Sequence, residues 1–173
     1  MRGLTEAILP DILEPNLRVV FCGSAAGAAS ARASAYYAGP GNKFWSILHH
    51  TGLTNRHLAA EEFSDLPEFG IGLTDLAKRV SGSDASLPRD GDDPAALEEK
   101  IHCYKPGLLA FNGKRAAQVY LNHQFGASNI DYGAQRWTIG NTFIHILPST
   151  SGAANRYWDE APWFALAREV KTV

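Results

Sequence analysis

Two short loops, each directly after an apolar segment, constrain this chain more than any other feature. The first loop, residues 23–27 with the sequence Gly-Ser-Ala-Ala-Gly, follows the apolar run 17–22. The second loop, residues 149–156 with the sequence Ser-Thr-Ser-Gly-Ala-Ala-Asn-Arg, follows the run 143–148. Small residues let backbone amides approach a ligand closely. Because ligands of open α/β sheets bind where loops leave the carboxyl ends of parallel strands, both loops are predicted to border one site.

The order of the expected elements predicts an α/β protein, because apolar runs typical of strands alternate with patterns typical of helices. The expected strands are 17–22, 73–76, 107–111, 136–139 and 142–147, and the expected helices are 42–51, 61–66, 94–104, 113–121 and 161–170. Gly140-Asn141 indicates a hairpin turn, and the polar segment 81–93 indicates a loop. We expect a three-layer αβα sandwich with a mostly parallel central sheet, in one domain spanning residues 1–173.

Composition excludes several classes of protein. No run of about 20 apolar residues is present, so no membrane span is expected. The start of the chain, from Met1 to Glu6, lacks the apolar core of a signal peptide, which favours a cytoplasmic protein. Two cysteines, Cys22 and Cys103, fit a reducing compartment and are too few for a four-cysteine metal site. The histidines form no ligand pattern, so neither a metal nor a cofactor is expected.

The net charge of −2 argues against a protein that binds DNA through bulk electrostatics, for which a basic domain is typical. It leaves room for a protein that touches few phosphates and holds one extruded base. Acidic residues also crowd into the segment 84–99, so other faces are less acidic than the total suggests.

A set of ordered motifs runs along nearly the whole chain, from about residue 12 to the last helix. Val20-Phe21-Cys22-Gly23 leads into the first loop, and Ser30 lies three residues past the last Gly of that loop. Tyr37 precedes Pro40-Gly41-Asn42-Lys43-Phe44-Trp45, and Leu147-Pro148 leads into the second loop. In order and spacing these motifs resemble those of the mismatch-specific uracil-DNA glycosylases, the bacterial relatives of thymine-DNA glycosylase.

This resemblance implies a monomeric DNA-repair enzyme that acts on bacterial DNA containing uracil or mismatched bases. The enzyme would hydrolyse the N-glycosidic bond of a flipped-out base without a metal or cofactor. The residues implied to surround the base are Gly23, Ser24, Ala25, Ser30, Tyr37 and Asn42, with Tyr37 stacked on the base. The residues implied to contact DNA are Lys43, Ser149, Thr150, Ser151, Gly152, Ala153, Asn155 and Arg156.

The chain departs from the family pattern at three positions. Ala25 stands where the family has the Asn that positions the attacking water, Ser149 replaces the Asn that opens the second loop, and Ala153 replaces an apolar wedge. A carboxylate could position the attacking water in place of the missing Asn, as carboxylates do in glycoside hydrolysis. Asp75, at the end of an expected strand, is the preferred candidate, and Asp84 is its rival.

Each of these residues also has a plain structural interpretation. Asp75 could cap a helix or pair with Arg79, and Asp84 could be a turn residue. Ser30 and Asn42 could simply form hydrogen bonds with the backbone, and Tyr37 could be a core residue. Asn155 and Arg156 could be polar residues of the solvent-exposed surface.

Three functions remain open at this point. The first is a glycosylase, and the second is a module of the same fold that grips flipped or mismatched bases without cleaving them. The third takes the first loop as a nucleotide-phosphate site. This third function is the weakest, because the loop lacks both the Gly-Lys-Ser/Thr ending of a P-loop and the third Gly of a dinucleotide fingerprint.

Overall fold

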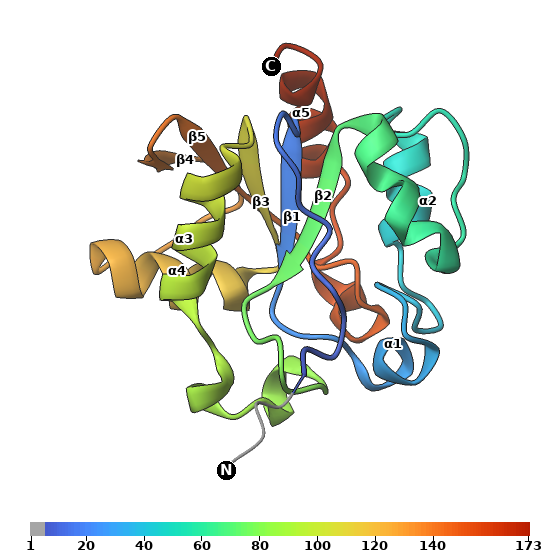
Figure 1. Ribbon diagram of the computed structural model, residues 1–173, viewed down its shortest axis with the longest axis horizontal. Coiled ribbons are helices and arrows are strands. Elements are labelled where there is room, and N and C mark those ends of the chain that lie inside the picture. Colours follow the sequence, from blue (N-terminus) through green and yellow to red (C-terminus); the bar gives the residue numbers. More distant parts are fainter. Residues whose placement is uncertain (1–5) are drawn as a thin grey trace.

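The computed structural model describes residues 6–173, which form one five-stranded sheet with the strand order β2-β1-β3-β5-β4 (Figure 1). The strands are β1 (Val19–Gly23), β2 (Ile71–Asp75), β3 (Leu108–Asn112), β4 (Gly133–Ile139) and β5 (Thr142–Leu147). β1 pairs in parallel with β2 and β3, and β3 pairs in parallel with β5. The edge strand β4 runs antiparallel to β5, as the predicted hairpin requires. The start of the chain, on which the expectation about a signal peptide was based, lies largely outside the described residues.

Helices cover both faces of the sheet, which confirms the predicted three-layer α/β sandwich. α2 (Phe44–His50) and α5 (Ala161–Val170) pack on one face, and α3 (Pro94–Tyr104) and α4 (Lys114–Phe125) pack on the other (Figure 1). Successive side chains of a strand point to opposite faces. In β1, Val19 and Phe21 therefore belong to one core, and Val20 and Cys22 belong to the other.

Trp163 of α5 ties the core to the second loop. Its fully buried ring stacks on Phe21, with the ring centroids 5.5 Å apart. Its indole Nε1 donates a hydrogen bond of 3.0 Å to the carbonyl oxygen of Pro148. Because Pro148 directly precedes the second loop, the position of that loop is fixed by packing in the interior.

The structure corrects four local expectations. α1 (Ala28–Ala33) was not predicted, because its run of Ala and Ser with one Arg has no apolar periodicity. The second loop ends in a 3-10 helix, Gly152–Tyr157, where only a loop was expected. α4 continues to Phe125, where the left-handed Gly126 ends it, rather than stopping at Leu121. The predicted loop 81–93 contains two short 3-10 turns, Asp84–Ser86 and Arg89–Gly91.

None of the helices in residues 6–173 combines the length and the apolar character that crossing a membrane requires.

Gly72 of β2 lies where the chain near Ile12 packs closely on the sheet. A methyl group on Gly72 would come within 2.6 Å of the carbonyl oxygen of Ile12 and of a methyl carbon of Leu17. That carbonyl accepts a hydrogen bond of 2.9 Å from the amide of Leu73, so it cannot move away without losing the bond. We expect Gly72→Ala to lower the free energy of unfolding by about 1–3 kcal/mol, measured by urea denaturation.

Gly27→Ala is the matched control, because Gly27 has a φ of −66° and no atom within 4 Å of the added methyl. Its effect should stay below about 1 kcal/mol. Equal losses in the two variants would show that the crowding at Gly72 has no bearing on stability.

Candidate active site

A cavity of about 690 Å³ opens at the carboxyl edge of the sheet, between the first loop, the second loop and the segment 36–42. It collects most of the residues that the sequence predicted for a single site. The predicted residues that line it are Gly23, Ser24, Ala25, Ser30, Tyr37, Asn42, Asp75, Asp84, Ser149, Thr150, Ser151, Gly152 and Ala153. Lys43, Asn155 and Arg156 do not line it.

Asp75 ends β2 directly opposite Gly23 of β1 in the parallel register. Its carboxylate occupies the space that a side chain at position 23 would need, since a methyl there would lie 2.7 Å from Oδ1 of Asp75. The side chain is 5% exposed. Within residues 6–173 it forms no ion pair with Arg79 and caps no helix, so neither of these two structural roles applies to Asp75.

The electrostatics around Asp75 favour its protonated form. Burial raises the pKa of Asp75 to about 6, with Asp11 adding to the rise and with Lys78 and Lys100 opposing it. Asp11 itself pairs with Lys78 at 2.9 Å and with Lys100 at 2.7 Å. Those lysines outweigh burial and hold the pKa of Asp11 below its usual value. Asp11 therefore offsets part of the effect of the two lysines on Asp75, and burial keeps the pKa of Asp75 raised.

Tyr37 and Cys22 share this buried environment. Burial, followed by the charge of Asp75, raises the pKa of both the Tyr37 phenol and the Cys22 thiol. The Asn112 side chain lies near enough to the Tyr37 hydroxyl to oppose the rise in its pKa. Within residues 6–173, however, no group meets the geometry of a hydrogen bond to this buried hydroxyl, which would lie 3.2 Å from a methyl on Gly23. A ligand in the cavity could satisfy this hydroxyl.

The backbone at Tyr37 is unusual, because its φ is +52°, a left-handed conformation that few residues other than Gly adopt. Its ring packs against Phe44, with the ring centroids 4.1 Å apart. Tyr37 therefore packs against the core, and the same residue borders the cavity.

The first loop is held by the chain that leaves β2. The carbonyl of Gly23 accepts from the amide of Leu76 at 2.9 Å, and that of Ser24 accepts from Ala77 at 2.7 Å. Within residues 6–173, no backbone carbonyl accepts a hydrogen bond from the amide of Ser24 or of Ala25. These amides are thus available to a ligand, although Ala25 brings only a methyl group as its side chain.

Ser30 and Asn42 satisfy backbone groups while they border the cavity. The Ser30 hydroxyl accepts from the amide of Ala38 at 3.0 Å. The Asn42 side chain accepts from the amide of Phe44 at 3.0 Å, a backbone hydrogen bond of the kind expected for Asn42. α2 itself begins at Phe44 with Lys43 as its N-cap, two residues later than the predicted start at residue 42.

Asn112 is a site residue that the sequence reasoning missed. It is the last residue of β3, it lines the cavity, and it is 8% exposed. Its side-chain oxygen accepts from the amide of Thr150, and its nitrogen donates to the Thr150 hydroxyl, both at 3.0 Å. Asn112 therefore clamps the second loop to the sheet. The available signal was a polar residue directly after the predicted strand 107–111, at the edge where the two loops lie.

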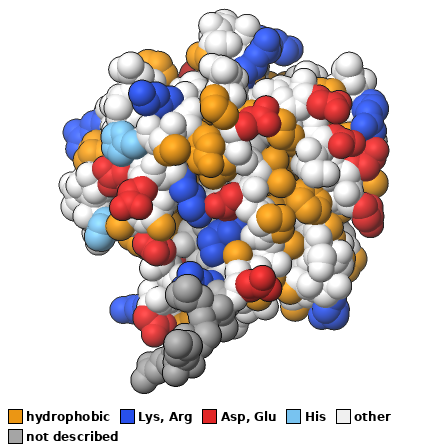
Figure 2. Space-filling model, viewed as in Figure 1, with side chains coloured by type: hydrophobic (Ala, Val, Ile, Leu, Met, Phe, Trp, Pro, Cys, Tyr) orange, Lys and Arg blue, Asp and Glu red, His pale blue; other side chains and the backbone are white. Residues whose placement is uncertain are grey.

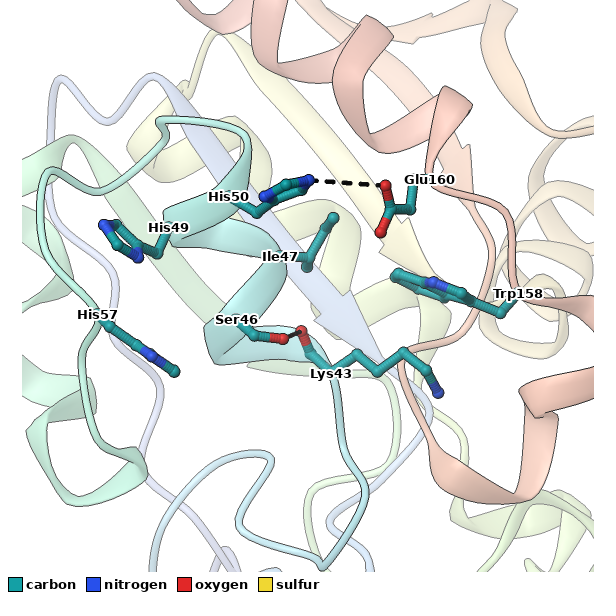
Figure 3. Close-up of a pocket in the computed structure, with 8 residues that line it drawn as sticks. All are labelled: Lys43, Ser46, Ile47, His49, His50, His57, Trp158 and Glu160. Atoms are coloured by element: carbon teal, nitrogen blue, oxygen red, sulfur yellow. Dashed lines mark hydrogen bonds and ion pairs between the residues drawn. The ribbon is translucent and has the colours of Figure 1, made fainter.

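Lys43 and Asn155, both predicted to contact DNA, lie together outside the cavity. The Lys43 ammonium donates to the Asn155 side chain and lies over the ring of Trp158, 5.3 Å from its centroid. A second groove of about 480 Å³ runs from Lys43 and Trp158 along α2. Figure 3 shows that His49 and His57 lie at its far end and that His50 points toward Glu160, 3.8 Å away.

No three His, Cys, Asp or Glu side chains within residues 6–173 come together in a group that could hold a metal ion. The cavity itself offers a buried carboxylate, an unpaired phenol, backbone amides and an amide side chain. Such groups can orient a water molecule and bind the carbonyl oxygens of a planar ring.

Comparison with known proteins assigns the family. The family model described as the uracil DNA glycosylase superfamily matches residues 10–169. The chain belongs to the uracil DNA glycosylase superfamily. It is also similar to the solution structure of a proposed uracil DNA glycosylase from Methanosarcina acetivorans, with 27% sequence identity and a TM-score of 0.63. That similarity covers 96% of this chain and 98% of the other.

Membership of the uracil DNA glycosylase superfamily supports DNA as the substrate, hydrolysis of a glycosidic bond as the chemistry, and a role in DNA repair. It also accords with the architecture, a mixed five-stranded sheet with helices on both faces.

The buried charge of Asp75 should lower stability at neutral pH. Its pKa is about 6 in the folded protein, against 3.8 as the ordinary value, so the folded state binds this proton more tightly than the unfolded chain does. Stability from this group is then full below about pH 4 and is lost as pH rises through about 6. We expect Asp75→Asn to raise the free energy of unfolding at pH 8 by about 1–3 kcal/mol.

The measurement is urea denaturation of both proteins at pH 8 and at pH 4, where the difference should shrink toward zero. Asp84→Asn serves as the control, because Asp84 is an exposed carboxylate on the rim of the same cavity, and its effect should stay within about 0.5 kcal/mol. An Asp75→Asn variant less stable than the wild type at pH 8 would show that the ionised carboxylate stabilises the folded protein, contrary to this expectation.

Proposed function

We propose that this protein is a monofunctional DNA glycosylase that removes uracil, or a related damaged or mismatched base, from DNA and leaves an abasic site. One observation carries the proposal beyond the family. The cavity that both loops line is also lined by the buried Asp75 at the end of β2. This carboxylate offers a replacement for the water-positioning side chain that Ala25 lacks.

The proposed reaction uses Asp75 in its ionised form. The carboxylate orients a water molecule toward the anomeric carbon of the sugar and offsets the positive charge that develops there. The bond between the sugar and the base breaks, and its electron pair leaves with the base. The water oxygen forms the new bond to the sugar, and Asp75 accepts the proton that the water loses.

The first loop would stabilise the departing base. The unpaired amides of Ser24 and Ala25 can donate to a base carbonyl as negative charge collects on it. The ring of Tyr37 would stack on the flipped base, and its unpartnered hydroxyl would find an acceptor in the occupied cavity.

DNA would be held by local contacts rather than by a uniformly basic face. Figure 2 shows acidic and basic side chains scattered together over one face of the molecule, in keeping with the net charge of −2. We propose that the second loop, with Lys43, borders the minor groove. Because Ala153 replaces a bulky wedge, discrimination between opposite bases should be weak.

The sharpest test replaces the proposed catalytic carboxylate. Asp75→Asn keeps the shape and removes the charge, so single-turnover excision of uracil from an oligonucleotide should fall by about 10²–10⁴-fold. Wild-type activity should persist in EDTA. It should rise with pH through about 6, where Asp75 is half ionised, and level off at higher pH. Alkaline cleavage of the abasic product on a gel measures the rate.

Asp84→Asn, on the same cavity rim, should leave the rate within a few-fold of the wild type. If instead Asp84→Asn abolishes cleavage and Asp75→Asn does not, the roles of the two carboxylates are reversed. A wild-type protein that binds uracil-containing DNA but never cleaves it would favour the binding module.

Tyr37 provides a test of base recognition that is separate from the chemistry. Stacking of a base on an aromatic side chain contributes roughly 1–3 kcal/mol, so Tyr37→Ala should weaken binding of a non-cleavable substrate analogue about tenfold or more. Tyr37→Phe keeps the ring and should retain most of the affinity. Unchanged affinity in a folded Tyr37→Ala protein, with folding checked by circular dichroism, would assign the ring to core packing alone.

A further inference from the structure

Four side chains outside the cavity form a mixed aromatic and basic surface. The guanidinium of Arg156 lies over the ring of Tyr157, 5.2 Å from its centroid, and the ammonium of Lys114 lies over the ring of Tyr132 at 4.5 Å. Tyr132 and Tyr157 belong to separate segments that both lie beside the second loop. The rise in the pKa of Tyr132, caused by burial and then by Tyr157, accords with this placement. We call Lys114, Tyr132, Arg156 and Tyr157 the tyrosine platform.

The tyrosine platform lies at the same edge of the sheet as the cavity. Tyr157 ends the 3-10 helix Gly152–Tyr157, whose first residues line the cavity. Tyr132 directly precedes Gly133, which pairs with Ile146 near the end of β5. Lys114 follows Gly113, and a methyl on Gly113 would lie 3.3 Å from Cβ of Ser149. Three separate segments therefore place the platform beside the second loop.

Core packing does not explain the exposure of Tyr157, whereas Tyr132 is half-buried and packs with one side against the core. Tyr157 is 61% exposed, and Lys114 and Arg156 are also exposed. No carboxylate among residues 6–173 lies within 4.0 Å of either cation. Arg115, the neighbour of Lys114, differs in this respect, because it pairs with Asp92 at 2.9 Å. Both platform cations are thus free to meet an anion.

The neighbouring part of the second loop cannot supply such contacts itself. Where the loop lines the cavity, Gly152, Ala153 and Ala154 offer a base only backbone and methyl groups. Each of the two tyrosine rings beside the second loop has a cation next to it. A ring with a cation beside it suits a base and its phosphate in a nucleic-acid strand, because every base has a face that can stack.

We propose that the tyrosine platform binds the DNA strand next to the extruded nucleotide, with unpaired bases stacked on Tyr157 and Tyr132 and with phosphates beside Lys114 and Arg156. The role beside an extruded nucleotide rests on the proposed function. Binding of undamaged single-stranded DNA to the platform does not, so the two can be tested separately.

The test is fluorescence anisotropy with a labelled, undamaged single-stranded oligonucleotide of roughly 12 nucleotides, a length in the range that such surfaces cover. Tyr157→Ala should weaken binding about tenfold, while Tyr157→Phe, which keeps the ring, should stay within about twofold. Phe143→Ala is the matched control, because Phe143 is a 54% exposed aromatic residue at the opposite end of the sheet, at the start of β5. Its affinity should not change.

A second arm tests the two cations. Replacing both Lys114 and Arg156 by Gln should reduce the slope of log affinity against log salt by about 1.4, which corresponds to two phosphate contacts on a single strand. An unchanged slope, or equal losses for Tyr157→Ala and Phe143→Ala, would overturn the proposal.

Measuring base excision distinguishes a failure of strand binding at the platform from a failure of the proposed glycosylase function. At saturating protein, Tyr157→Ala should excise uracil at the wild-type single-turnover rate, because Tyr157 lies outside the cavity. A wild-type protein that binds single strands through the platform but excises no base would contradict the proposed function, while strand binding by the platform would remain supported. Loss of single-turnover excision in Tyr157→Ala would instead place Tyr157 in the catalytic machinery and overturn its assignment to strand binding.

Discussion

The arrangement of the cavity depends on the register between β1 and β2, which sets Gly23 opposite Asp75 at the carboxyl edge of the sheet. The missing side chain at Gly23 makes room for a carboxylate that would otherwise have to turn toward solvent. The same register lets Gly23 and Ser24 accept hydrogen bonds from the chain leaving β2, so the first loop and Asp75 are positioned by one set of contacts. Burial of the acid, and the rise in its pKa, follow from this geometry.

The second loop reaches the cavity through a different set of constraints. Trp163 holds Pro148 from the core side, and Asn112 holds Thr150 from the end of β3. The backbone of Lys43 donates to the carbonyl of Thr150 at 2.9 Å, which joins the segment before α2 to the same point. A loop of small residues without packing side chains of its own is thereby kept in one place. Such a loop can present backbone groups to a ligand without first having to be ordered.

The sequence predicted the layers of the fold and half of the residues that line the cavity, because both depend on local signals. Apolar runs ended by Gly mark the strands, and strand ends in a parallel sheet converge, so the two loops had to meet. Asn112, Lys114, Tyr132 and Tyr157 were not predicted, because their roles depend on residues distant in the chain. Asn112 acts through Thr150, and Lys114 lies over Tyr132. Arg156 of the platform was among the residues expected to contact DNA. The positions of Lys43 and Asn155 outside the cavity likewise follow from their mutual contact. The burial of Asp75 could not be read from spacing either, since Arg79 four residues later suggested a surface ion pair.

The close approach of Asp75 to Gly23 also limits how this sequence can diverge. A side chain at position 23 and a carboxylate at position 75 compete for the same volume, since a methyl carbon would lie 2.7 Å from Oδ1. A substitution at position 23 therefore limits which residues position 75 can hold, and the reverse is also true. Among homologues, a residue larger than Gly at position 23 should coincide with a smaller residue at position 75, so that the two columns covary. A lineage that gained a side chain at position 23 would have to move its hydrolytic group to another element of the fold.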